Sequence, residues 1–199
     1  WGLAEAETPS EEMLIQVLKR VHRHPEKPFG SSISRLVGRH PHIASNPEIL
    51  QIVIWYALNG EANEDEAAEK QSIERETINI KTFVQRGGIL QIRGNGVRGQ
   101  AWEALSSVLW EVEEAANTIW ESFDIALEKE NLASVRCSMM KVLAPFFNKD
   151  KERFADAIKR LIVLPQNQLV KTDTLRLSPL ITHTGISLFP YIFYGLPEL

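Results

Sequence analysis

Three glycines, Gly94, Gly96 and Gly99, have the G-x-G-x-x-G spacing of loops that bind the pyrophosphate of a dinucleotide. Glycine lets the backbone approach phosphate closely, and a following helix offers its N-terminus to the negative charge. Such a loop belongs to a βαβ unit whose second strand ends in an acidic residue that binds ribose. Residues 89–92 form a short apolar run before the glycines, but residues 113–128 have a helical period. We therefore favour a glycine turn between two closely packed helices over a dinucleotide site, and expect no cofactor.

Two His-x-His pairs, His22 with His24 and His40 with His42, are candidate zinc ligands. The two rings of such a pair share a face when the segment is extended, and diverge when it is helical. Both pairs lie near prolines that break helices, and no cysteine or paired carboxylate accompanies them. We expect ordinary surface histidines and no metal site.

Basic residues are concentrated between residues 19 and 42, where Glu26 is the one acid. They are Lys19, Arg20, Arg23, Lys27, Arg35 and Arg39. Arginine can bind phosphate through two parallel hydrogen bonds, so one hypothesis is a phosphate-facing patch that binds nucleic acid. Phe29 is the one Phe, Tyr or Trp there, which argues against a platform for stacking bases. We favour a solvated basic surface, or one that meets the acidic residues between 48 and 80.

Composition restricts the remaining chemistry. A net charge of -4 and a pI near 5.8 provide no global basic field for nucleic acid. The lone Cys137 cannot form an internal disulfide and favours a reducing, cytoplasmic compartment. No Ser-His-Asp or Cys-His set has a recognisable local context, and no apolar run has the roughly 18 residues expected of a membrane span. We expect a non-catalytic, soluble protein without a membrane partner.

Periodic apolar residues predict a series of helices. Asn46 and Pro47 are typical of a helix start, and the apolar residues of 48–58 surround the helix axis, which predicts a position inside a stack. Glycines and prolines between 25 and 45 limit the expected helix there to residues 32–37, within a structured connection. Further helices are predicted from Glu11 to His24 and over 65–85, 97–110, 113–128, 135–147 and 150–164, with two less regular ones after residue 166.

One helical phrase occurs twice, 38 residues apart. Val97-Arg98 opens the first copy and Val135-Arg136 opens the second, each after a short polar turn. The apolar stripe of the two copies is Val97, Ala101, Ala104, Leu105 and Val108, then Val135, Met139, Val142, Leu143 and Phe146. A period near 40 residues is typical of stacked helix pairs. The sequence therefore predicts an all-α fold.

These phrases resemble HEAT-type helical repeats, in which a polar turn precedes Val-Arg at the start of the second helix of each pair. The first copy, from Asn95 to Leu105, is also similar to the N-x-V-R-G-x-A-x-E-A segment in the C-terminal repeats of large bacterial STAND-class defence ATPases. The resemblance implies a HEAT-like α-solenoid of antiparallel helix pairs, best defined over 95–164, that senses a ligand or partner. Because this chain has no P-loop, the ATPase activity of such proteins does not follow.

Arg98 and Arg136 occupy equivalent positions in the two copies. We expect each to bridge neighbouring repeats by bonding turn carbonyls or an acidic side chain. Replacing either with alanine should then lower stability by roughly 1–3 kcal/mol. Trp102, Trp110 and Trp120 are expected in the core, although an exposed tryptophan on a concave face would be a good partner anchor.

The chain begins with Trp1 rather than Met, so we expect one helical-repeat domain, 1–199, cut from a larger protein. The predicted function is a non-catalytic module of a STAND-like cytoplasmic ATPase that senses a protein partner, a ligand or the rest of the larger chain. One alternative is a nucleic-acid-binding helical protein that uses residues 19–42. A second is a free-standing scaffold for protein interactions.

Overall fold

The computed structural model describes residues 10–61, 96–147 and 150–162, which contain seven α-helices and no strand. The helices are α2 (Glu11–His22), α3 (Gly30–Arg39), α4 (Pro47–Asn59), α7 (Val97–Glu111), α8 (Ala116–Lys129), α9 (Ala133–Leu143) and α10 (Lys151–Ile162). Short 3-10 helices lie at three connections, η1 (Pro41–Ser45), η3 (Glu113–Ala115) and η4 (Ala144–Phe146). The all-α prediction is confirmed for these ranges. The helices predicted over 65–85 and after 166, and the apolar run 89–92, lie outside the described residues.

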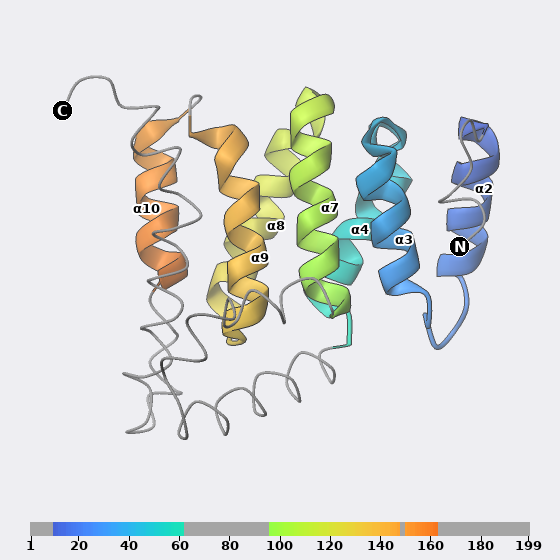
Figure 1. Ribbon diagram of the computed structural model, residues 1–199, viewed down its shortest axis with the longest axis horizontal. Coiled ribbons are helices and arrows are strands. Elements are labelled where there is room, and N and C mark those ends of the chain that lie inside the picture. Colours follow the sequence, from blue (N-terminus) through green and yellow to red (C-terminus); the bar gives the residue numbers. More distant parts are fainter. Residues whose placement is uncertain (1–9, 62–95, 148–149, 163–199) are drawn as a thin grey trace, which may run out of the picture.

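The helices stand side by side in two layers (Figure 1). α3, α7 and α9 form the nearer layer, with α4 and α8 behind them, and α7 packs against α3, α9 and α4. Gly30 at the start of α3 lies beside Val97 at the start of α7, and Gly38 near the end of α3 lies beside Ala104. α3 and α7 therefore run in the same direction, and each is followed in the chain by a helix of the other layer.

The core runs between the two layers. α4 is buried on nearly all sides, as its apolar composition predicts, and Asn46 caps it by accepting a hydrogen bond from the backbone N–H of Glu48 at 3.0 Å. Trp102 of α7 and Trp120 and Phe123 of α8 are buried, and the Phe123 ring lies edge-on to Trp102 and tilted against Trp120. The apolar stripe predicted for each repeat copy is also buried in this core, apart from Val97 and Phe146, which are partly buried against it.

The segment 25–45 is more regular than predicted. In place of a helix limited to residues 32–37, α3 spans Gly30–Arg39 and is a full member of the nearer layer. Gly38 lies within this helix and faces Ala104 of α7. The interpretation as a connection was wrong because tertiary packing outweighs the low helix propensity of glycine.

Two further boundaries depend on local chemistry. α9 ends at Leu143 rather than at residue 147, because Pro145 cannot donate to the helix ladder and the chain tightens into η4. α8 begins after η3, so the predicted start at Glu113 is a 3-10 turn. None of the described helices is long and apolar enough to cross a membrane.

Candidate functional site

Arg136 lies at the point where three helices meet. Its side chain is fully buried, and its guanidinium donates hydrogen bonds to four backbone carbonyls. Nε bonds the carbonyl of Glu130 at 2.7 Å, Nη2 bonds Leu127 at 2.9 Å, and Nη1 bonds Arg160 and Leu161 at 3.1 and 2.8 Å. Two of these carbonyls lie near the end of α8 and two near the end of α10, where helix carbonyls lack intrahelical donors. Arg136 therefore joins α9 to the ends of both helices.

Arg98 of α7 contacts the same turn, between α8 and α9, through Glu130. Glu130 is 5% exposed, and its Oε2 lies 2.9 Å from Nη1 of Arg98, while its Oε1 accepts the backbone N–H groups of Asn131 and Leu132 at 3.0 and 2.9 Å. Burial lowers the pKa of Arg136, and the negative charge of Glu130 acts in the opposite direction. The two repeat arginines thus meet at one residue, Arg98 at its carboxylate and Arg136 at its carbonyl.

The structure divides the basic segment between two helices. α2 packs against α4 and η1, whereas α3 packs against α7. Lys19 forms an ion pair with Glu48, and Lys27 donates to the carbonyl of His22 at 2.8 Å while its Nζ lies 4.8 Å from the centre of the Trp55 ring. These two lysines are therefore engaged within the fold. Arg20, Arg23, Arg35 and Arg39 have exposed side chains.

A shallow hollow of about 340 Å³ lies between α2 and α4. Lys19, Arg23 and Glu48 line it together with His22 and Gln51. Because Glu48 is paired with Lys19, the hollow presents both signs of charge rather than a basic pocket. It gives the phosphate hypothesis little support.

The two histidine pairs have different surroundings. His22 packs edge-on against Trp55 and Tyr56, with ring centres 5.5 and 5.3 Å apart, and both its burial and the charge of Lys27 lower its pKa. The rings of His40 and His42 are 6.1 Å apart and nearly perpendicular. Within the described ranges, no three residues of the types His, Cys, Asp and Glu are grouped so that they could hold a metal ion.

The glycine motif is described in part. Gly96 precedes α7 and Gly99 lies in its first turn, both buried, and Gly94 lies outside the described residues. The side chain of Cys137 in α9 also lies outside the description.

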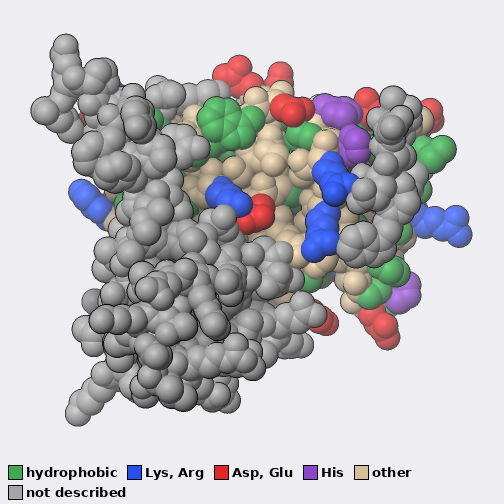
Figure 2. Space-filling view, viewed as in Figure 1, with side chains coloured by type: hydrophobic (Ala, Val, Ile, Leu, Met, Phe, Trp, Pro, Cys, Tyr) green, Lys and Arg blue, Asp and Glu red, His purple; other side chains and the backbone are tan. Residues whose placement is uncertain are grey.

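Trp110 differs from the other tryptophans of the repeats. Trp102 and Trp120 are 0% and 2% exposed, whereas Trp110, in the last turn of α7, is 62% exposed. Glu111 and Glu114 follow it and are exposed as well. Figure 2 shows acidic side chains gathered along the edge of the molecule at which α7 ends. The expectation that Trp110 lies in the core was therefore wrong, although the glutamates after it were an available signal of exposure.

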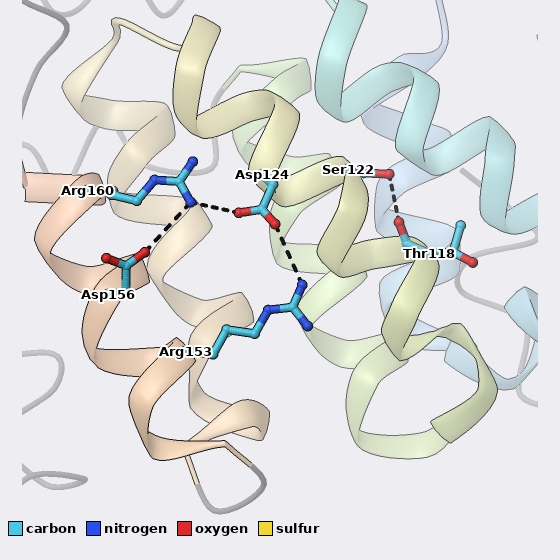
Figure 3. Close-up of polar contacts among 6 residues, drawn as sticks. All are labelled: Thr118, Ser122, Asp124, Arg153, Asp156 and Arg160. Atoms are coloured by element: carbon cyan, nitrogen blue, oxygen red, sulfur yellow. Dashed lines mark hydrogen bonds and ion pairs between the residues drawn. The ribbon is translucent and has the colours of Figure 1, made fainter.

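The repeats also contact each other through surface charges. Lys141 of α9 pairs with Glu103 of α7 at 2.7 Å, and the two occupy equivalent positions in the two copies. In the other layer, Asp124 of α8 lies 3.0 Å from Arg160 and 3.6 Å from Arg153, both of α10 (Figure 3). Ion pairs thus link α7 to α9 and α8 to α10.

Comparison with protein-family models, with curated proteins and with solved structures finds no match to this chain. The likeness to HEAT repeats and to STAND proteins therefore rests on the two Val-Arg phrases.

Proposed function

We propose that this chain is a non-catalytic binding module of the HEAT-like α-solenoid type, which recognises a protein partner or another part of a larger cytoplasmic protein. The proposal is supported by contacts between equivalent positions of the two copies, such as Glu103 with Lys141. It is also supported by the common direction of α3 and α7. Stacked helix pairs offer an extended surface that suits recognition.

Trp110 is the observation that carries the proposal. Trp110 has 62% of its surface exposed, which leaves a large apolar area in contact with water. Covering that area with a partner would be favourable, because removal of apolar surface from water lowers the free energy. Tryptophan is also among the residues that contribute most to binding energy at protein interfaces. The edge that bears Trp110 is therefore the proposed recognition surface.

Site-specific photo-cross-linking tests this surface. A benzophenone amino acid replaces Trp110 in the full-length gene product, and a control replaces Ile125, which is 44% exposed on α8 in the other layer. We expect position 110 to cross-link to one identified protein, or to one identified segment of the larger chain. Position 125 should not give that product. Equal cross-linking from both positions, or none from position 110, would contradict the proposal.

The STAND context has a separate test. We propose that the larger protein has an NTPase domain before Trp1, as the resemblance implies. The gene sequence upstream of Trp1 should then encode a P-loop, and the full-length protein should hydrolyse ATP or GTP. A gene without a P-loop would favour the free-standing scaffold instead.

The nucleic-acid alternative depends mainly on the exposed arginines Arg20, Arg23, Arg35 and Arg39. Binding that neutralises several phosphates falls steeply as salt rises. We would measure binding of labelled single- and double-stranded DNA and RNA at low and physiological salt, for the wild type and for an Arg35→Ala/Arg39→Ala variant. We expect no tight binding at physiological salt. Tight binding that the variant loses would favour the alternative.

A further inference from the structure

Two tryptophans of this protein have a cation over their ring. The guanidinium of Arg153 lies 4.2 Å from the centre of the Trp120 ring, and Nζ of Lys27 lies 4.8 Å from the centre of the Trp55 ring. The negative face of an indole attracts such a cation, and more strongly when water is partly excluded. The fold therefore uses tryptophan as a receptor for basic side chains at two separate places.

The Trp120 receptor includes a carboxylate. Asp124 lies four residues after Trp120 on α8, and its Oδ2 is 3.6 Å from Nη2 of Arg153 (Figure 3). The guanidinium carbon of Arg153 thus lies over the ring, while one of its terminal nitrogens, Nη2, lies beside the carboxylate. This division suits arginine, whose planar group stacks and donates hydrogen bonds at the same time.

The edge that bears Trp110 has the same residue types. Glu114 follows Trp110 by four residues, and Glu111 is adjacent to it. α7 ends at Glu111, so Glu114 lies in η3 rather than one helical turn above the ring. All three side chains are exposed, and within the described residues none of them has an ion pair or a cation over a ring. This edge therefore has an aromatic ring and carboxylates like those around Arg153, but no basic side chain of the described residues lies over the ring.

We propose that Trp110, Glu111 and Glu114 receive an arginine side chain of a partner protein. This inference rests on the proposed function, because it names the chemistry of the partner for the same surface. The negative charge of the edge favours a basic protein segment and disfavours nucleic acid, whose phosphates the glutamates repel. Arginine is favoured over lysine because its guanidinium can stack on the indole while both carboxylates accept its N–H groups.

Nuclear magnetic resonance of the ¹⁵N-labelled chain tests the inference with a defined probe. The probe is a nine-residue peptide of three Arg-Gly-Ser repeats, and the control peptide has citrulline, a neutral analogue of similar shape, in place of arginine. The Trp110→Ala variant identifies the indole N–H signal of Trp110. We expect this signal to shift and saturate with the arginine peptide and to stay in place with the citrulline peptide.

Matched variants separate a receptor from general attraction to acids. Glu111→Gln/Glu114→Gln should weaken binding of the arginine peptide by about tenfold, since two charge contacts are lost. Glu121→Gln/Glu128→Gln removes the same charge from exposed positions of α8 and should leave the affinity unchanged. Equal weakening by both pairs, or peptide binding that persists in Trp110→Ala, would overturn the inference.

The cross-linking experiment and the peptide-binding experiment test different claims, so a negative result in each has a different meaning. Specific cross-linking from position 110 without arginine-peptide binding would retain the binding module and reject arginine as its target. Loss of specific cross-linking would reject the module itself. An unchanged circular dichroism spectrum and thermal midpoint for Trp110→Ala would show that lost peptide binding does not reflect unfolding.

Discussion

Arg136 is a charged side chain with no exposed surface, so its hydrogen bonds determine whether the site is stable. Replacing it with alanine leaves three buried carbonyls and one half-buried carbonyl without this donor, in addition to a cavity. We expect Arg136→Ala to lower the free energy of unfolding by about 3 kcal/mol, since one unsatisfied buried group already costs roughly 1–3 kcal/mol. Urea denaturation monitored by circular dichroism measures the change.

Two comparisons make this prediction specific to the guanidinium. Lysine keeps the charge but cannot reach carbonyls on both sides, so Arg136→Lys should lose most of the same stability. Arg98→Ala should cost about 1 kcal/mol, because Arg98 is 18% exposed and Glu130 keeps two backbone donors. Exposed Arg20 is the reference position for an alanine substitution. If all three alanine variants have the same midpoint, Arg136 has no structural role.

His22 makes stability depend on pH. Its folded-state pKa lies below the unfolded value near 6.5, because burial and the charge of Lys27 disfavour the protonated ring. The unfolded chain therefore binds more protons in the interval between the two values, and stability rises with pH there. This contribution is present above pH 6.5 and is lost as pH falls through the folded pKa.

Titration of the imidazole signals by nuclear magnetic resonance checks the pKa of His22. We expect it below 6.5 in the wild type and higher in Lys27→Met, which removes the nearby positive charge. The slope of stability against pH between the two pKa values should become smaller in that variant. A His22 pKa at or above 6.5 in the wild type would contradict the packing against Trp55 and Tyr56.

At the scale of elements, α3 depends on two glycines in different ways. A Cβ on Gly30 would clash with Val97 and lie 2.7 Å from Cδ1 of Tyr56, whereas a Cβ on Gly38 would make ordinary contacts with Ala104 at 3.6 and 3.7 Å. We expect Gly30→Ala to destabilise the protein by about 2 kcal/mol, through overpacking where α3, α4 and α7 meet. Gly38→Ala should be neutral or stabilise by up to about 1 kcal/mol, since alanine favours helix. Thermal unfolding of the pair gives the comparison. Equal midpoints would show that α3 and α7 do not pack at Gly30 as described.

The same helix shows what the sequence could and could not predict. The start of α4 was predictable, because Asn46 and Pro47 act on their own neighbours. The length of α3 was not, because the close packing of Gly30 against Val97 and Tyr56 is a contact with α7 and α4 that local propensity does not include. Likewise, the sequence indicated that Arg98 and Arg136 were equivalent, but their common contact at Glu130 depends on how α7 lies against the turn between α8 and α9.

At the scale of the whole molecule, a stack of helices and a single globular core differ in how many helices one destabilising substitution affects. Each helix of the described residues mainly contacts its neighbours, and α7 links the first three helices to the last three. In a repeat stack, stability is roughly a sum of local units and the interfaces between neighbours. In a single cooperative core, one substitution lowers the protection of all helices equally.

Hydrogen exchange of the Arg136→Lys variant distinguishes the two cases. Arg136 bonds the ends of α8 and α10, so exchange protection in α8, α9 and α10 should fall by up to about a hundredfold. The amides of α2, α3 and α4 should keep nearly wild-type protection. Gly30→Ala should instead lower protection in α2, α3 and α4 and leave that of α8, α9 and α10 nearly unchanged, because the contacts of Gly30 lie with α4 and α7. Uniform loss in both variants would show one cooperative core and would argue against the α-solenoid that we propose.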